Sequence, residues 1–401
     1  YIFKGATTPT TDDGGTYKDI FGGRSILGNT TTQNEITVSD AVTYRNAYGG
    51  WTSGTGTTLT EKGNSIANKI TVASTVTDIT GKVYGGYTDV AGSKATGNKV
   101  TIEKSITGGV VGGKAAGDAS GNTVTVKANT GAVTGGDGAT TNNNTVNLEG
   151  NVTVNGTVTG GTQATGTNNT LHVAGENNSA TNIGGFQNVK FNTNGVAANG
   201  TMLTLNGGAE SKVDWNTLTV NGNGSGITLL KNDAGINLTN YTDGAVKSGL
   251  STDRKSEINI SVVKNAVTQK YTDIKYTGNQ FMGVESADIQ GTKAYGGISK
   301  AGNSTRENKI SVNGSYDEVY GGHTSGSGTG EADKNNSHDN TVTITGGTLG
   351  KVYGGYTDAA DGTTENNTVN LGDGTNPLAP GSTVAEIHGG NKSAKGNTLN
   401  V

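Results

Sequence analysis

The chain has 401 residues, a formal net charge of −4, 68 Gly, 3 Pro and no Cys, and only 30% of its residues are hydrophobic. The lack of cysteine excludes a thiol nucleophile and a zinc–thiolate site, and the charge balance does not favour nucleic-acid binding. No apolar run reaches the length of a membrane-spanning helix, so we expect no membrane insertion. The low apolar content would suit disorder, but apolar residues fall in alternating pairs such as Val100/Ile102 and Val342/Ile344, which indicates ordered strands.

A unit of two elements repeats along the chain at intervals of roughly 22 to 36 residues, which is typical of a stacked repeat protein. One element is a strand of the form Asn-x-(Val/Ile/Leu)-x-(Val/Ile/Leu), and the other is a Gly-Gly pair. The strand elements begin at Asn34, Asn68, Asn98, Asn122, Asn144, Asn169, Asn216, Asn308, Asn340, Asn367 and Asn397. The glycine pairs begin at Gly22, Gly49, Gly85, Gly112, Gly135, Gly160, Gly184, Gly296, Gly321, Gly354 and Gly389.

These repeats predict an all-β solenoid, and the best fit is a right-handed parallel β-helix of roughly 14–15 coils. Frequent glycine and the lack of a helical apolar stripe argue against helices. We expect each opening Asn to occupy a corner, where its amide bonds to the Asn of the next coil. We expect the glycine pairs to supply positive φ at the following corner.

Residues 1–220 read as the N-terminal block of coils. The chain advances 18 residues from Gly50 to Asn68, and again from Gly322 to Asn340, but only 8 or 9 residues at the same place in the coils 113–122, 136–144 and 161–169. This difference predicts longer loops on one side of the solenoid, at 51–67 and 323–339. Unequal loops on a rigid scaffold are where recognition usually resides.

Residues 221–292 interrupt the repeat, because no glycine pair occurs between Gly208 and Gly296. The strand-like run at 257–262 persists, which indicates irregular coils or an inserted element. A binding insertion and simple decay of the repeat both remain open. The stretch is locally basic, with Lys247, Arg254, Lys255, Lys264, Lys270 and Lys275. Regular coils resume in the C-terminal block, residues 293–401.

Aromatic residues cluster beside the glycine pairs in the first and last coils. In Val83-Tyr84 and Val352-Tyr353, strand alternation sends Val inward and Tyr outward. Outward rings in register could bind sugar rings or a partner protein, or they could stack on one another and shield the coils. The candidate ligand-binding residues are Tyr48, Trp51, Tyr84, Tyr87, Tyr295, Tyr320, His323, Tyr353 and Tyr356.

Catalytic and metal motifs are weak, so we expect no enzyme, no cofactor and no metal site. The four histidines lie in different parts of the repeat, and no nucleophile elbow is found. Asp89, Asp137 and Asp358 are too scattered for the clustered acids of a β-helix polysaccharide enzyme. The run Gly135-Gly136-Asp137-Gly138 is a single imperfect copy of a calcium-binding repeat.

Three kinds of segment resemble the repeats of large bacterial autotransporter adhesins, such as those of fusobacteria and their relatives. They are Val-Tyr-Gly-Gly-Tyr-Thr-Asp at 83–89 and 352–358, Val-Tyr-Gly-Gly-His-Thr at 319–324, and Asn-Thr-Val-Thr-Ile-Thr-Gly-Gly at 340–347. The resemblance covers roughly 15–220 and 290–401 and is moderately specific. It implies a type V secreted passenger domain on a right-handed β-helix. Because neither a signal peptide nor an export domain is recognisable, we expect a passenger fragment.

The function implied is that of a virulence-associated adhesin at the bacterial cell surface, displayed from the outer membrane or secreted. Its expected partners are a host-cell protein or glycan, or other bacterial cells. An alternative is a structural stalk or self-associating segment that promotes aggregation and biofilm. A polysaccharide-degrading enzyme is a minor alternative.

Overall fold

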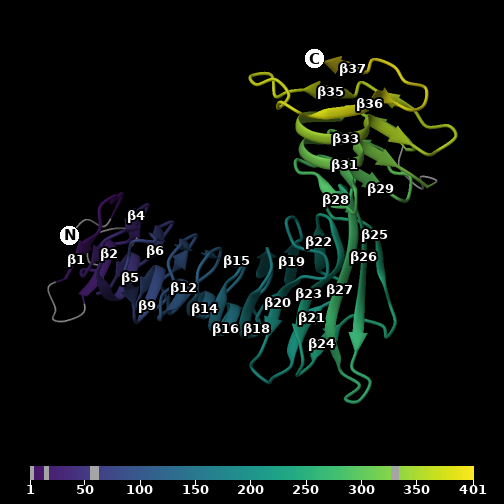
Figure 1. Ribbon diagram of the computed structural model, residues 1–401. Coiled ribbons are helices and arrows are strands. Elements are labelled where there is room, and N and C mark those ends of the chain that lie inside the picture. The colour runs from purple at the N-terminus through teal and green to yellow at the C-terminus, as the bar shows by residue number, and fades with distance from the viewer. Residues whose placement is uncertain (1–3, 13–17, 55–62, 327–333) are drawn as a thin grey trace. The chain divides into compact units, whose positions relative to one another are not determined.

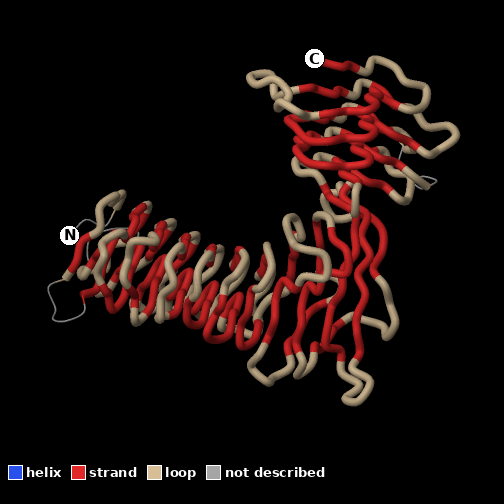
Figure 2. Tube along the Cα trace, viewed as in Figure 1, coloured by secondary structure: helices blue, strands red, loops and turns tan. Residues whose placement is uncertain are grey.

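The computed structural model describes residues 4–12, 18–54, 63–326 and 334–401. These ranges contain strands, turns and loops and no helix, so they hold no helix long and apolar enough to cross a membrane (Figures 1 and 2). The chain forms two compact units. Unit 1 comprises residues 1–219, 226–245 and 261–275, and unit 2 comprises 220–225, 246–260 and 276–401.

Unit 1 is a stack of parallel strands joined in chain order (Figure 1). The largest sheet runs through β2 (Lys18–Ser25), β5 (Thr43–Thr52), β9 (Lys82–Thr88), β12 (Gly109–Lys114), β14 (Thr130–Asp137), β16 (Thr153–Gly161), β18 (Asn178–Gly184), β20 (Thr201–Leu205) and β23 (Gly224–Asn232). A second sheet contains β4 (Glu35–Val38), β7 (Lys69–Val72), β11 (Lys99–Ile102), β13 (Thr123–Val126), β15 (Thr145–Glu149), β17 (Thr170–Ala174), β19 (Asn188–Asn192) and β22 (Leu218–Asn221). Shorter strands are β1 (Thr10–Thr11), β3 (Thr31–Thr32), β6 (Ser65–Ile66), β8 (Asp78–Ile79), β10 (Ala95–Thr96), β21 (Ser211–Asp214) and β24 (Ile236–Thr239).

Unit 2 repeats this plan with longer strands. Its main sheet contains β28 (Asp288–Gln290), β29 (Lys293–Ser299), β31 (Lys309–Thr324), β33 (Thr341–Thr357), β35 (Thr368–Leu371), β36 (Thr383–Gly390) and β37 (Thr398–Asn400). A small sheet contains β30 (Thr305–Arg306), β32 (Ser337–His338) and β34 (Thr364–Glu365). The prediction of an all-β, solenoid-like stack of parallel strands is confirmed.

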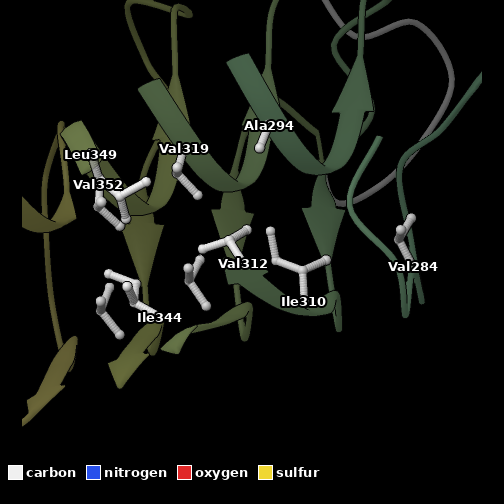
Figure 3. Packing of buried hydrophobic residues seen from close by; sticks show 10 residues of the cluster. Val284, Ala294, Ile310, Val312, Val319, Ile344, Leu349 and Val352 are labelled. Carbon is white, nitrogen blue, oxygen red and sulfur yellow. The ribbon is translucent and has the colours of Figure 1, made fainter. Parts of the chain in front are cut away.

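The alternating apolar pairs of the repeat form the core. Val100 pairs in register with Ile70 on one side and with Val124 on the other, and all three side chains are buried. In unit 2, Ile310, Val312, Val319, Ile344 and Val352 belong to one buried cluster (Figure 3). Each coil therefore needs few apolar residues, because they pack on the equivalent residues of the neighbouring coils.

The predicted asparagine ladder is present in both units. Nδ2 of Asn68 donates to Oδ1 of Asn98 at 3.1 Å, and the backbone N–H of Asn68 donates to the same oxygen at 3.0 Å. The residue before each asparagine of the ladder adopts the left-handed conformation, as Ala67 does with a φ of 54°. Asn216 is exposed and lies outside the ladder, which passes from Asn169 to Gln187. The side-chain Nδ2–Oδ1 bonds link Asn34, Asn68, Asn98, Asn122 and Asn144 in unit 1, and Asn308, Asn340, Asn367 and Asn397 in unit 2.

The prediction that the glycine pairs supply positive φ is wrong. Apart from Gly185, no glycine of these pairs has a left-handed φ, and most of the pairs lie inside strands. The pairs are required because other atoms approach too closely for a side chain. A Cβ on Gly86 would lie 2.4 Å from Nδ2 of Asn98, and a Cβ on Gly85 would lie 2.4 Å from the carbonyl oxygen of Gly112. The two repeated elements are thus one packing unit, in which the ladder asparagine fits against glycine.

Residues 221–292 contain β23, β24 and β28 and, between β24 and β28, the strands β25 (Lys247–Leu250), β26 (Ser256–Lys264) and β27 (Tyr271–Gln280). The predicted strand at 257–262 lies within β26, which pairs with β25 in antiparallel fashion. The two compact units divide within this region rather than at a single point in the chain.

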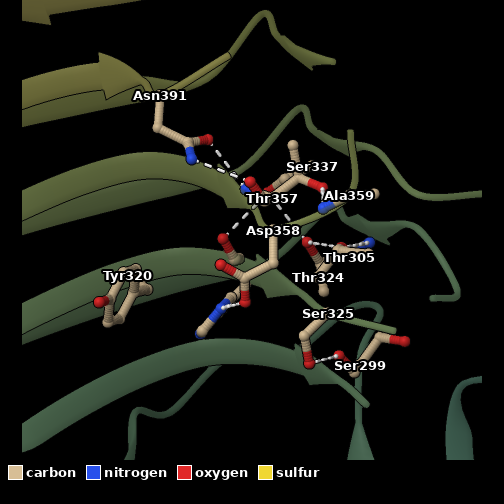
Figure 4. A network of polar contacts seen from close by, with 12 residues as sticks. Ser299, Thr305, Tyr320, Thr324, Ser325, Ser337, Thr357, Asp358, Ala359 and Asn391 are labelled. Carbon is tan, nitrogen blue, oxygen red and sulfur yellow. Dashed lines mark hydrogen bonds and ion pairs between the residues drawn. The ribbon is translucent and has the colours of Figure 1, made fainter. Parts of the chain in front are cut away.

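The first coils of the two units are internal copies. Residues 25–34 read Ser-Ile-Leu-Gly-Asn-Thr-Thr-Thr-Gln-Asn, and residues 299–308 read Ser-Lys-Ala-Gly-Asn-Ser-Thr-Arg-Glu-Asn. Oγ1 of Thr31 donates to Oγ of Ser65 at 3.0 Å. In the same way, Oγ1 of Thr305 donates to Oγ of Ser337 at 2.9 Å in unit 2 (Figure 4). An antiparallel strand precedes the first coil of each copy, β1 against β2 and β28 against β29. The chain therefore contains, besides the repeat of single coils, a group of several coils that occurs twice, once in each unit.

Candidate functional site

The candidate aromatic residues of unit 1 form one outward row. The rings of Phe21 and Tyr48 stack with centroids 5.1 Å apart, and those of Tyr48 and Tyr84 stack at 5.1 Å. Trp51 packs edge-on against Phe21 at 5.9 Å, and Tyr87 packs edge-on against Tyr84 at 5.2 Å. Val83 is buried in the core on the opposite side of its strand, as the alternation predicted.

Unit 2 carries the equivalent row. Tyr295 stacks on Tyr320 at 5.2 Å, Tyr320 on Tyr353 at 5.4 Å, and Tyr353 on His388 at 4.8 Å. Tyr356 packs edge-on against Tyr353 at 4.9 Å. The nine candidate residues are thus brought together as two groups, one in each unit.

His323 joins the second row through ring contacts with Tyr295, Tyr320 and Tyr356. Its ring lies 4.8 Å from that of Tyr320, and its Nε2 lies 2.9 Å from Oδ2 of Asp358. Trp51 occupies the equivalent position in unit 1. The two rows therefore have the same layout but different chemistry at their edges.

Self-stacking buries the centre of each row and leaves its edge accessible. Tyr48 and Tyr320 retain only 8% and 4% of their exposure, whereas Trp51, Tyr87, Tyr353 and several neighbours are half-buried. Burial raises the pKa of the Tyr84 hydroxyl to about 12. The rings therefore stack on one another, as one of the two interpretations predicted, and some of them keep part of their surface in solvent.

A row of alternating charge runs beside the aromatic row of unit 2. Lys293, Glu318, Lys351 and Glu386 stand opposite one another on successive strands. Lys293 and Glu318 form an ion pair, and this bond to lysine lowers the pKa of the Glu318 carboxyl. Oε2 of Glu318 also accepts a hydrogen bond from the Tyr320 hydroxyl at 2.8 Å. The charge row and the aromatic row are therefore linked.

A shallow groove lies on the far side of the charge row. It has a volume of about 530 Å³ and is lined by Thr292, Ser315, Tyr316, Asp317, Thr348, Leu349, Gly350, Thr383, Val384 and Ala385. A second hollow of about 420 Å³ shares Asp317, Gly350 and Ala385 with it and includes the charge row. Along β29, β31, β33 and β36, a groove residue, a charged residue and an aromatic ring thus follow one another within a few residues.

Catalytic groups do not gather in the described parts of the chain. His323 and His388 each contact one carboxylate, of Asp358 and Glu386. Across the described ranges, no three His, Cys, Asp or Glu side chains are placed to hold a metal ion.

Several members of these rows were not among the predicted site residues. His388 was missed although it precedes a glycine pair, as the ring-bearing tyrosines do. The charge row could also have been found, since each member stands two residues before a ring. Much of the two predicted long loops, residues 55–62 and 327–333, lies outside the described residues.

No family model, no curated protein and no solved structure matches the chain.

Proposed function

We propose that this chain is part of a bacterial cell-surface adhesin built on a right-handed parallel β-helix, which binds a host-cell glycan through the outer face of unit 2. The observation that carries the proposal is the succession of groove, charge row and aromatic row on the same strands. Each of the three supplies one element of sugar recognition.

Glycan binding requires apolar and polar contacts in alternation. The half-buried rings of Tyr353 and Tyr356 offer faces and edges to the C–H side of a sugar ring. Lys351 and Glu386, which are about half exposed, can donate to and accept from sugar hydroxyls. The groove beside them can hold further sugar units, since it crosses successive strands.

A glycan array with the purified chain tests this proposal. We expect binding to a restricted set of glycans, and at least a tenfold loss in a variant that carries both Tyr353→Ala and Tyr356→Ala. The matched control is Tyr84→Ala with Tyr87→Ala, because these two residues occupy the positions of Tyr353 and Tyr356 in unit 1. Binding that survives the unit 2 changes, or no binding to any glycan or host protein, contradicts the proposal.

Self-association is a second candidate, favoured by the order of charges in unit 2. The sequence Lys293, Glu318, Lys351, Glu386 is self-complementary, because a second copy related by a twofold axis places Lys opposite Glu at every position. Concentration-dependent dimers that dissociate in high salt, together with an empty glycan array, would favour this stalk-like role over glycan binding.

A further inference from the structure

The turn formed by residues 299–303 of unit 2 binds the carboxylate of Glu257 through four hydrogen bonds. Oγ of Ser299 donates to Oε1 of Glu257 at 2.5 Å, and Nδ2 of Asn303 donates to the same oxygen at 2.9 Å. The backbone N–H of Ala301 donates to Oε1 at 3.2 Å, and that of Lys300 donates to Oε2 at 2.9 Å. Two consecutive backbone N–H groups and two side chains converge on one anion, which is the geometry of a nest.

Unit 1 contains a copy of this turn after β2. The backbone N–H of Asn29 donates to Oγ of Ser25 at 2.8 Å, and the equivalent bond from Asn303 to Ser299 measures 2.7 Å. Gly28 has a φ of 74°, and its counterpart in unit 2 has 78°. The two turns therefore carry the same kinds of donor at corresponding positions: a serine hydroxyl, two consecutive backbone N–H groups and an asparagine amide.

The two turns differ in what the donors contact. Among the described residues, no acidic side chain bonds to the Ser25 hydroxyl, to the backbone N–H groups of Ile26 and Leu27, or to the Asn29 amide. Ser25 is 4% exposed, so its hydroxyl is fixed by packing. The side chains of Ile26 and Leu27 are 48% and 66% exposed and form an apolar border beside the donors.

We propose that the turn from Ser25 to Asn29 is a docking site for the glutamate side chain of an extended peptide segment in a separate partner. The carboxylate accepts the four hydrogen bonds that Glu257 accepts in the copy, and an apolar residue next to it covers Ile26 and Leu27. Glu257 belongs to strand β26, so the carboxylate that binds in the copy comes from an extended segment. This site is in unit 1 and is independent of the glycan-binding face.

The test uses a fluorescent peptide with the sequence of residues 254–261, Arg-Lys-Ser-Glu-Ile-Asn-Ile-Ser, and blocked ends, so that Glu provides the only carboxylate. Fluorescence anisotropy with the whole chain measures its affinity. A peptide with Gln in place of Glu is the matched control, because it keeps the shape of the side chain but has no charge and carries an NH2 donor in place of one acceptor oxygen. We expect the Gln peptide to bind at least tenfold more weakly, since bonds to a charged acceptor are the stronger ones.

Two variants of the chain locate the binding. Asn29→Asp replaces a donor by a like charge, and Ile26→Glu places a carboxylate at the exposed border without altering the turn. Each should weaken binding of the Glu peptide at least tenfold, whereas Asn216→Asp, an exposed change of the same charge, should not.

Three results overturn the proposal: no binding at millimolar peptide, equal binding of the Glu and Gln peptides, or full binding by Ile26→Glu. Association of the chain with itself that the Glu peptide abolishes also overturns it, because a second copy would then supply the carboxylate. If Asn29→Asp does not fold, the surface variant Ile26→Glu decides the question alone.

Discussion

The coils that begin at Phe21 and those that begin at Tyr295 have the same interior. Each contains a ladder of buried asparagines, a glycine pair against each asparagine and a chain of Thr and Ser hydroxyls that links coils. Stacking in register sets these positions, because a side chain that fits one coil must also fit the coils above and below it.

The outer faces of the two copies differ. Where unit 2 has the row Lys293, Glu318, Lys351, Glu386, unit 1 has Asp19, Asn46, Lys82, Gly109. Asp19 is 8% exposed and accepts two bonds from the Arg45 guanidinium, so its charge is neutralised within the sheet. The duplication thus preserves a scaffold while the outer chemistry diverges, which is the pattern expected of a frame that carries different surfaces.

The largest expected effect on stability comes from replacing one ladder asparagine in each unit. Asn98→Ala and Asn340→Ala should each lower local stability by about 3–5 kcal/mol, since several buried donors and acceptors lose their partners at once. Both asparagines are fully buried. Hydrogen–deuterium exchange of the adjoining strands measures the loss in each unit separately.

Asn216→Ala is the matched control for the ladder variants, because Asn216 is exposed and outside the ladder. Its effect should stay below about 0.5 kcal/mol. A large loss at Asn98 beside a small one at Asn340 would show that the two interiors are not equivalent in energy.

The next effect comes from the glycine pairs. A Cβ on Gly86 or on Gly355 would lie 2.4 or 2.5 Å from Nδ2 of its ladder asparagine, so Gly86→Ala and Gly355→Ala should each cost about 1–3 kcal/mol. Gly184→Ala is the control: it belongs to a glycine pair, but no atom lies within 4 Å of its added Cβ and its φ is ordinary. A penalty at Gly184 equal to that at Gly86 would contradict the packing explanation.

The glycine pairs also show how far the sequence alone could lead. The repeat predicted strands, inward valines and an asparagine ladder, because alternation and periodicity report directly on register. It misassigned the glycine pairs to corners, since glycine is favoured equally by positive φ and by close approach. The carboxylate turn after Ser299 was not predicted, because its ligand Glu257 lies 42 residues earlier in the chain.

A smaller difference is expected within the aromatic rows. The hydroxyl of Tyr320 donates to Glu318 at 2.8 Å, whereas Tyr84 makes no side-chain hydrogen bond within the described residues. Tyr320→Phe should therefore cost about 1–2 kcal/mol at neutral pH and Tyr84→Phe close to nothing. Thermal unfolding of both variants at pH 7 measures this. Equal losses would indicate that the hydroxyl of Tyr320 contributes no more than that of Tyr84.

Alkaline pH offers a second readout on the same rings. The folded pKa of Tyr84, about 12, lies above the ordinary value of 10.0, so its neutral form stabilises the fold. This contribution is complete below pH 10 and declines as the pH rises toward 12. Tyr84→Phe cannot ionise and should unfold at higher pH than the unmodified chain, and an unchanged alkaline midpoint would contradict the assignment.

The smallest effect concerns the charge row of unit 2, whose positions are taken in unit 1 by Asp19, Asn46, Lys82 and Gly109. The bond from Lys293 lowers the folded pKa of Glu318 below the ordinary 4.5, so the carboxylate contributes stability above about pH 4.5 that is lost as the pH falls through the folded value. Glu318→Gln should therefore lower the unfolding temperature slightly at pH 7 and flatten its fall between pH 5 and pH 3. Because Asn46 takes the place of Glu318 in unit 1, hydrogen exchange in that unit should not respond to Glu318→Gln, and a response there would mean that the two outer faces are not independent.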